Sequence, residues 1–402
     1  MVSLLPIILV VFVLASLFRI AFIYHVLYVL LAVLVLARLW SAAVARRLRV
    51  DRAFPERGLF GETVTVELTL TNESPLPVPW VRIHDRLPVE LAAAALFERA
   101  LSLGPRGRAS FTYQLHCRQR GWYELGPATV ETGDVMGFDR RRREFSSDRR
   151  LLVYPKILSP AALGLASRTP FGDVRTRQPL YEDPARVSGV RDYQPGDSLR
   201  RINWRSSAAT GRLQVRKLEP AMTLRTIVAL DLDVAAYERS RSHYATELAI
   251  VVAASLIADL IDRRQEVGLL SNGVDRATGT PIDLAPRKGR PQLTRLLDAL
   301  ARVEAYAGEP LEARVGAAMG DLSWGATVVL ITGRATDAVR RLVGRLRRAG
   351  FAVVVVLVTQ VSAYGDGMAA LGAPIHYVWR ESDIDDVGDA GPRRRPTRLA
   401  AG

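Results

Sequence analysis

An apolar run at the start of the chain limits the possible folds more than any other feature. The chain is almost wholly apolar from Leu4 to Leu39, and Arg19 divides this run into two parts. A single straight helix of that length would be about 50 Å long, whereas the hydrocarbon core of a membrane is about 30 Å thick. The run therefore predicts a transmembrane helical hairpin over residues 1–45, with a first span at residues 4–18, a turn at Arg19 and a second span ending near Leu39.

Two other interpretations of this run are open. A cleaved signal peptide is disfavoured, because no lysine or arginine precedes the run and no clear cleavage site follows it. A buried helical hairpin in a soluble protein is the other alternative. The arginines around the exit of the second span favour the membrane, and the positive-inside bias then places the rest of the chain in the cytosol; these are Arg38, Arg46, Arg47, Arg49 and Arg52.

The overall composition agrees with a globular, membrane-associated chain. Its 402 residues carry 55 Lys+Arg against 41 Asp+Glu, a net charge of +14, and are 49% hydrophobic, which excludes a disordered chain. Cys117 is the only cysteine, which excludes a disulfide framework and multi-cysteine zinc modules. We expect the basic residues to contact a lipid bilayer rather than nucleic acid. The arginine run at residues 140–143 has no interleaved aromatic residues, and it is typical of a solvated hairpin.

Residues 50–155 have the pattern of a β domain. Residues 62–71 alternate, with Val64, Val66, Leu68 and Leu70 on one face. Short alternating runs with Gly, Pro and Asn between them predict an immunoglobulin-like β-sandwich.

The second half of the soluble part has a different pattern. Residues 156–225 are rich in proline and arginine and read as a linker. Residues 226–380 alternate between short apolar strands and helices, which predicts a parallel α/β sheet covered on both faces. Residues 381–402 are acidic and then basic, and we predict that they are disordered.

The densest motif lies inside the linker. It reads GVRDYQPGD over residues 189–197, RRINWRSSA over 200–208 and VRKLE over 215–219. The QPGD segment predicts a tight turn, in which Asp197 has Arg200 and Arg201 as potential partners. Two interpretations are equally open. Either the motif is an extended strap that Trp204 anchors to the α/β domain, or its arginines form a contact surface for a partner.

This motif resembles that of the bacterial family called domain of unknown function 58, in which R-x-Y-x-P-G-D precedes R-x-I-x-W, S-A and a closing glutamate. The resemblance implies a paired membrane span, a β-rich region and a von Willebrand factor A-like (Rossmann-like) α/β domain. It also implies location in a bacterial cell membrane and work with a MoxR-type AAA+ ATPase. The candidate partner-binding residues carried by the motif are Arg191, Tyr193, Pro195, Gly196, Asp197, Arg200, Arg201, Trp204 and Arg205.

The metal site implied by a von Willebrand A-like domain is incomplete in this sequence. Such domains bind Mg²⁺ through D-x-S-x-S after the first strand and an aspartate after a later one, since oxygen ligands suit a hard cation. Here Asp231 and Asp233 are present, but Ala235 has no ligand oxygen, and Gly333 and Arg334 follow the later strand. We therefore expect no metal cofactor, and Asp231 and Asp233 are doubtful candidates for metal ligands. We expect these two aspartates to cap local structure or to pair with arginines.

Other catalytic signatures are absent from the sequence: it has no G-x-x-x-x-G-K-[ST], H-E-x-x-H, G-x-S-x-G or C-x-x-C. The sequence therefore predicts a non-enzymatic, membrane-anchored scaffold or adaptor. The main alternative is a metal-dependent protein-binding module, and an uncharacterised hydrolase is a third.

Overall fold

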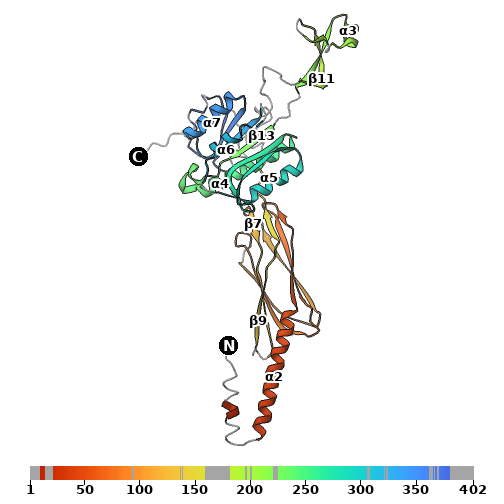
Figure 1. Cartoon of the computed structure of the whole chain (residues 1–402), viewed down its shortest axis with the longest axis vertical. Helices are drawn as coiled ribbons and strands as arrows, with labels where there is room; N and C mark the ends of the chain where they lie inside the picture. Colours follow the sequence, from red (N-terminus) through yellow and green to blue (C-terminus); the bar gives the residue numbers. More distant parts are fainter. Residues whose placement is uncertain are drawn as a thin grey trace, which may run out of the picture. The chain divides into compact units, whose positions relative to one another are not determined.

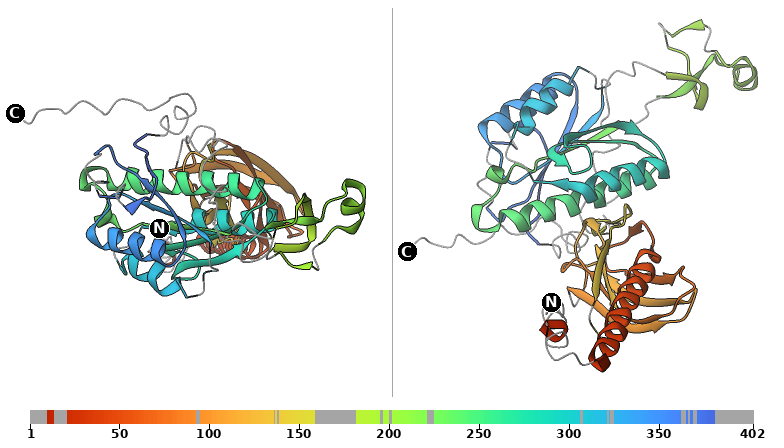
Figure 2. Two further views of the ribbon diagram at one scale, coloured as in Figure 1. Left: turned by 90° about the horizontal axis from the view of Figure 1, so that it is seen from above. Right: turned by 60° about the horizontal axis from the view of Figure 1, so that its bottom comes forward.

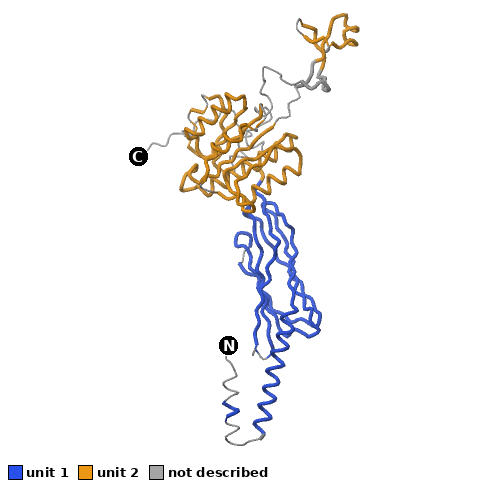
Figure 3. Tube along the Cα trace, viewed as in Figure 1, with its two compact units in different colours: residues 1–156 blue, residues 157–402 orange. Residues whose placement is uncertain are grey.

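The computed structural model describes residues 10–13, 21–158 except 93, 94, 136 and 138, and 182–380 except 195, 196, 200, 201, 221–224, 306, 307, 321, 323, 324, 362–364, 366, 369 and 370. The chain divides into two compact units, Met1–Lys156 (unit 1) and Ile157–Gly402 (unit 2), which Figure 3 colours separately. The predicted tail, residues 381–402, lies outside the described residues, as does most of the first predicted span.

Unit 1 contains the long helix α2 (Ala21–Arg46), which is apolar enough to cross a membrane and has almost none of its apolar stretch buried (Figure 1). Helix α4 (Ser242–Asp262) in unit 2 passes the same test of length and composition, but most of it is buried in a core. Among the described residues, α2 is therefore the candidate membrane span.

The end of α2 is fixed to the β strands that follow it. The guanidinium of Arg143 donates from Nη1 to the carbonyl oxygens of Ala45 (2.7 Å), Arg46 (3.0 Å) and Leu48 (3.2 Å). A cation at these carbonyls, which have no partner within the helix, stabilises a helix C-terminus. The prediction of a solvated arginine run was therefore wrong for Arg143, and also for the half-buried Arg141, which pairs with Asp139 at 2.9 Å.

The β-rich region is confirmed: sheets of mostly antiparallel strands, with one parallel pair between β2 and β10, pack around one apolar core. The predicted inward face of residues 62–71 is confirmed too, since Val64, Val66, Leu68 and Leu70 are all buried. One sheet has the order β1 (Leu48–Ala53), β3 (Thr63–Asn72), β6 (Arg108–His116), and a second has the order β5 (Leu96–Leu103), β4 (Val78–Arg86), β8 (Ala128–Gly133), β9 (Arg140–Phe145). A third contains β2 (Arg57–Gly58), β10 (Arg150–Val153) and β7 (Gly121–Glu124).

A buried ion pair crosses this core. Arg52 and Asp85 form two hydrogen bonds of 2.5 and 3.2 Å, and their side chains are only 4% and 0% exposed. Tyr113 donates to the same carboxylate at 2.8 Å, and Arg52 also donates to the Leu125 carbonyl at 2.8 Å. Arg52 is therefore not part of the arginine cluster at the membrane exit, which corrects the interpretation of the sequence.

Unit 2 contains a mixed sheet rather than a purely parallel one. Its order is β15 (Thr280–Arg287), β14 (Glu266–Asp275), β13 (Arg225–Leu230), β17 (Thr327–Thr332), β18 (Ala352–Leu357), β19 (Ile375–Tyr377). The five strands from β14 to β19 run parallel, whereas β15 and the short β16 (Val303–Glu304) run antiparallel to β14. Neither of these two antiparallel strands was predicted from the sequence.

Helices cover both faces of this sheet, as expected (Figure 2). Helices α4 and α5 (Arg290–Arg302) pack together on one face. On the other face, α6 (Leu311–Ala318) and α7 (Asp337–Arg348) share a core with alternate residues of the central strands, such as Ile227 and Ala229. The carboxyl ends of the parallel strands therefore meet at one edge, where loops bring polar side chains together.

The motif segment folds as a hairpin of its own. Strands β11 (Glu182–Asp192) and β12 (Gln214–Pro220) pair antiparallel, and the short helix α3 (Trp204–Thr210) lies between them in the chain. Figure 1 labels β11 and α3. Instead of the extended strap, which was one of the two open interpretations, the two ends of the motif pair with each other.

Candidate functional site

The motif hairpin is held together by its own polar residues. The backbone N–H of Asn203 donates to the carbonyl of Gln214 at 2.8 Å, and the Asn203 side chain caps α3 by accepting from the N–H of Ser206 at 3.3 Å. Ser207 donates from Oγ to the Asn203 carbonyl at 2.8 Å and accepts from the N–H of Gln214 at 2.9 Å. Asn203, Ser206 and Ser207 of the motif thus have a structural role: they hold α3 against the start of β12.

Arg191 and Asp197 close the other side of the motif. The two groups form a bidentate pair, with Nη2–Oδ1 at 2.5 Å and Nη1–Oδ2 at 2.7 Å, and Asp197 also accepts from the N–H of Gln194 at 2.9 Å. Arg191 is thus a partner of Asp197. The expected partners Arg200 and Arg201 lie outside the described residues, together with Pro195 and Gly196. Half-buried Tyr193 is fixed by its N–H, which donates to the carbonyl of Leu213 at 2.9 Å.

Large apolar side chains of this hairpin remain in solvent. Trp204 is 66% exposed and Leu199 is 68% exposed, and Leu213 and Val190 are exposed as well. Trp204 is therefore not the buried anchor that the strap interpretation required, and this interpretation was wrong. The exposed Arg205 follows Trp204 on α3. The motif fixes its backbone internally and leaves apolar and cationic side chains outside.

The second candidate region is the carboxyl edge of the sheet in unit 2, where Asp231 is buried. Its Oδ2 accepts from Thr332 Oγ1 at 2.8 Å, and its Oδ1 accepts from Asn272 Nδ2 at 2.9 Å and from the N–H of Asp233 at 3.1 Å. Burial raises the pKa of Asp231, although the bonds from Thr332 and Asn272 act in the opposite direction. Both carboxylate oxygens of Asp231 are thus already occupied by protein donors.

The neighbouring loop residues are also bound within the protein. The Asp233 carboxylate accepts from the N–H of Ala235 at 2.9 Å and caps the single turn η3 (Val234–Ala236). Arg334 donates to the carbonyl of Ala235, so its guanidinium lies over the loop. At Gly333 any side chain would collide with the carbonyl oxygen of Ala236, which explains why no carboxylate follows this strand.

Sequence reasoning missed Asn272 and Thr332 as members of this cluster. Thr332 is the last residue of β17, and Asn272 directly follows the residues of β14 that pair with β13. This place at the carboxyl edge of the strands next to β13 is the signal that would have found them. The described part of the chain contains no group of three or more His, Cys, Asp or Glu side chains placed to hold a metal ion.

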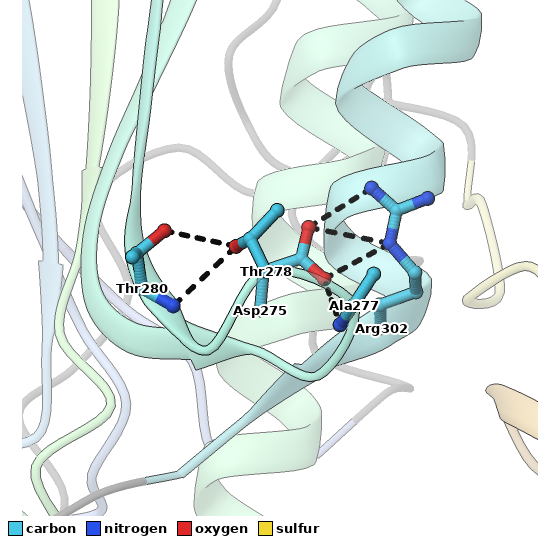
Figure 4. A network of polar contacts seen from close by, with 5 residues as sticks. All are labelled: Asp275, Ala277, Thr278, Thr280 and Arg302. Atoms are coloured by element: carbon cyan, nitrogen blue, oxygen red, sulfur yellow. Dashed lines mark hydrogen bonds and ion pairs between the residues drawn. The ribbon is translucent and has the colours of Figure 1, made fainter.

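A third polar cluster closes the β14–β15 turn (Figure 4). Arg302 donates to both oxygens of Asp275 at 2.9–3.2 Å, and Asp275 also accepts from the N–H of Ala277 at 2.8 Å. The cluster borders an open cavity of about 420 Å³, which Asp283, Arg295 and Asp298 also line. The network satisfies the turn internally, and we assign it a structural role.

The residues around the motif match a known family. The family model described as "Protein of unknown function DUF58" matches residues 189–363. The chain carries a DUF58 region. The resemblance inferred from the motif is thereby confirmed, and the matched residues extend from the motif hairpin to the end of β18 and the loop after it.

The relatives of this chain add little about its activity. The uncharacterized protein YeaD of Bacillus subtilis (strain 168) is 25% identical over 283 residues, which cover 69% of this chain and 68% of that protein. Among solved structures, the CARDB domain of a Pyrococcus furiosus protein has a TM-score of 0.19 at 15% identity, covering 26% of this chain and 86% of that one. A β-glucosidase from Listeria innocua has a TM-score of 0.15 at 16% identity, covering 25% of this chain and 16% of that one. Scores this low support no argument about fold or function.

Proposed function

We propose that the DUF58 chain is a non-enzymatic adaptor, anchored in a bacterial cell membrane, that binds a MoxR-type AAA+ ATPase through its motif hairpin. The exposure of Trp204, on a hairpin whose backbone is fixed by its own hydrogen bonds, is the observation that carries this proposal. A rigid, exposed tryptophan next to arginine is typical of the residues that dominate binding energy at protein interfaces. The ATPase itself is implied by the family resemblance.

The membrane part of the proposal rests on α2. We propose that α2 is the second half of a transmembrane hairpin and that the residues after it lie in the cytoplasm. The apolar exposed surface of α2 supports the span, and exposed arginines at its end, Arg38, Arg46 and Arg47, support this orientation. In this arrangement unit 1 is an immunoglobulin-like sandwich next to the membrane, and the sheet of unit 2 is a von Willebrand factor A-like domain.

The alternative is a metal-dependent protein-binding module at the carboxyl edge of the sheet. The buried position of Asp231 beside Thr332 is the observation that favours it. Against it, both oxygens of Asp231 are engaged, Asp233 caps η3, and the guanidinium of Arg334 lies over the same loop, where it would repel a cation. The adaptor is therefore the better-supported proposal.

A capture experiment from membranes tests which surface binds the partner. The tagged full-length chain should retain an AAA+ ATPase, identified by mass spectrometry, whereas the double variant Trp204→Ala/Leu213→Ser should lose it. Both side chains are exposed, so the melting temperature should not change, since surface substitutions stay within about 0.5 kcal/mol.

The matched control for this experiment is Val234→Ser, at an exposed position on η3 at the carboxyl edge of the sheet. The adaptor proposal predicts that this variant still captures the ATPase. Loss of capture in Val234→Ser alone would instead support the alternative module, and retention of the ATPase by the double variant would contradict a role of the hairpin.

A further inference from the structure

The loop between β8 and β9, residues 134–139, is held at its two ends by hydrogen bonds and carries the exposed apolar side chain of Val135; residues 136 and 138 lie outside the described residues. Asp139 donates its N–H to the carboxylate of Asp134 at 2.6 Å, and the indole of Trp80 donates to the Asp134 carbonyl at 3.1 Å. Val135 is 77% exposed, whereas both carboxylates are buried. The loop therefore presents an apolar residue without exposing its two acidic groups.

This loop lies beside α2, on the side from which the helix enters unit 1. Along β9, Arg143 contacts the carbonyls at Ala45 and Arg46, and Asp139, four residues earlier, contacts the hydroxyl of Ser41. Strand β9 thus runs in the same direction as α2, and the residues before Asp139 continue towards the apolar part of the helix. Figure 1 shows β9 next to the end of α2.

The position of Ser41 marks the end of the apolar stretch. About 20 residues are needed to cross the hydrocarbon core, and the stretch from Ala21 to Trp40 has this length. Trp40 donates its indole N–H to the carbonyl of Pro77 at 3.1 Å, in the manner of an aromatic residue at a membrane interface. Loop 134–139 is therefore at the depth of the headgroups.

The charges around the loop suit an anionic lipid surface. Arg38, Arg46 and Arg140 are exposed, and the nearby acidic side chains of Glu73 and Glu144 are paired with Arg49 and Arg142. Basic side chains close to a membrane are attracted to anionic lipids by about 1 kcal/mol each. An apolar tip flanked by arginines is the pattern of an interfacial membrane contact.

We propose that loop 134–139 inserts Val135 into the headgroup layer of the membrane that α2 spans. This inference rests on the membrane anchoring proposed above. It gives unit 1 a second lipid contact beside its helix. With Arg143 and Asp139 fixing the helix end to β9, the loop then sets the angle at which the sandwich leaves the membrane surface.

Fluorescence quenching in vesicles tests the proposal on the full-length chain. The chain is reconstituted in phosphatidylcholine and phosphatidylglycerol vesicles, with a nitrobenzoxadiazole label at Val135→Cys, Val29→Cys or Leu59→Cys in separate samples. All three positions are exposed, and the native Cys117 is buried and stays unlabelled. Val29 lies within α2. Leu59 lies just before the start of β3. The other end of β3, at Asn72, pairs with Leu48 directly after α2, so Leu59 is at the end of the strand that is away from the helix.

We expect lipids brominated near the headgroup to quench the label at 135 and lipids brominated deep in the acyl chain to quench the label at 29, and we expect neither lipid to quench the label at 59. Quenching at 29 without quenching at 135 would overturn the loop contact and leave the anchoring intact. A blue-shifted label at 135 without bromine quenching would show that protein covers the loop, which also overturns the proposal. No quenching at 29 would refute the membrane anchoring, and the loop inference with it.

Discussion

Replacing Asp85 by alanine should destabilise unit 1 by about 3–5 kcal/mol, because removal of one partner leaves a buried charge uncompensated. Arg52 would keep its guanidinium in the core with the Leu125 carbonyl as its remaining acceptor among the described residues, and Tyr113 would lose the acceptor of its hydroxyl. Burial and the Asp85 carboxylate raise the pKa of Tyr113, so this hydroxyl stays a donor across the ordinary pH range. The loss should appear as faster hydrogen exchange in β4 and β8.

Three comparisons make this test specific. Peptides from β17 in unit 2 should keep their exchange rates, since that sheet has its own core. Asp51→Ala, at an exposed position next to Arg52, should change stability by less than about 0.5 kcal/mol. The double variant Arg52→Met/Asp85→Leu removes both charges and should be less destabilised than Asp85→Ala. Unchanged exchange in β4 and β8 of Asp85→Ala would show that the pair does not stabilise the sandwich.

Asp231→Ala should destabilise unit 2 by about 1–3 kcal/mol, because it leaves buried donors from Thr332, Asn272 and the Asp233 backbone without an acceptor. Asp231→Asn should be at least as stable as the native chain at neutral pH. The amide can accept from Asn272 and Asp233 through its oxygen and donate to Thr332 through its nitrogen, and it carries no buried charge. Thermal unfolding of the three proteins measures both effects.

The pH dependence follows from the raised pKa of Asp231. An acid whose pKa is higher in the folded state contributes its full stability below its unfolded pKa, about 3.8 here, and loses that contribution as the pH rises through the folded value. Asparagine does not titrate, so Asp231→Asn should gain stability relative to the native chain as the pH rises from acid to neutral. A difference that shrinks over this interval would contradict the assignment.

The same proteins test for a metal site. We expect Mg²⁺ to leave the melting temperature unchanged relative to EDTA, whereas binding at a hundredfold excess over Kd would add about 2.7 kcal/mol. A shift in the native chain that disappears in both Asp231→Asn and Asp231→Ala would show that Asp231 binds the ion and would favour the alternative module.

Local patterns predicted the elements of this fold better than their long-range partners. The alternation at residues 62–71 predicted which side chains of β3 are buried, because strand periodicity depends only on neighbouring residues. Arg52 was assigned to the membrane side, because its partner Asp85 lies 33 residues further along the chain and nothing near Arg52 in the sequence indicates the pair. Arg143 was assigned to solvent for the same reason, since the helix end that it caps is 97 residues away.

At the candidate site, too, the sequence predicted local features but not contacts between distant parts of the chain. The sequence identified Asp231, Asp233 and the unusual residues Ala235, Gly333 and Arg334, because they follow recognisable strands. It did not predict that Asn272 and Thr332 occupy the Asp231 carboxylate, which depends on the order of strands in the sheet. The exposure of Trp204 was missed because burial was inferred from residue type alone, whereas the polar residues around α3 hold the motif without it.

The central claim is that a membrane-anchored DUF58 chain binds an AAA+ ATPase through its motif hairpin. The most direct test is the affinity of the purified MoxR-type ATPase of the same bacterium for the full-length chain in lipid nanodiscs. We predict saturable binding to the native chain and to Val234→Ser, and binding at least about tenfold weaker to Trp204→Ala/Leu213→Ser, as expected for the loss of an aromatic hot spot. Equal affinity of the folded double variant, or no binding to the native chain, would contradict the account.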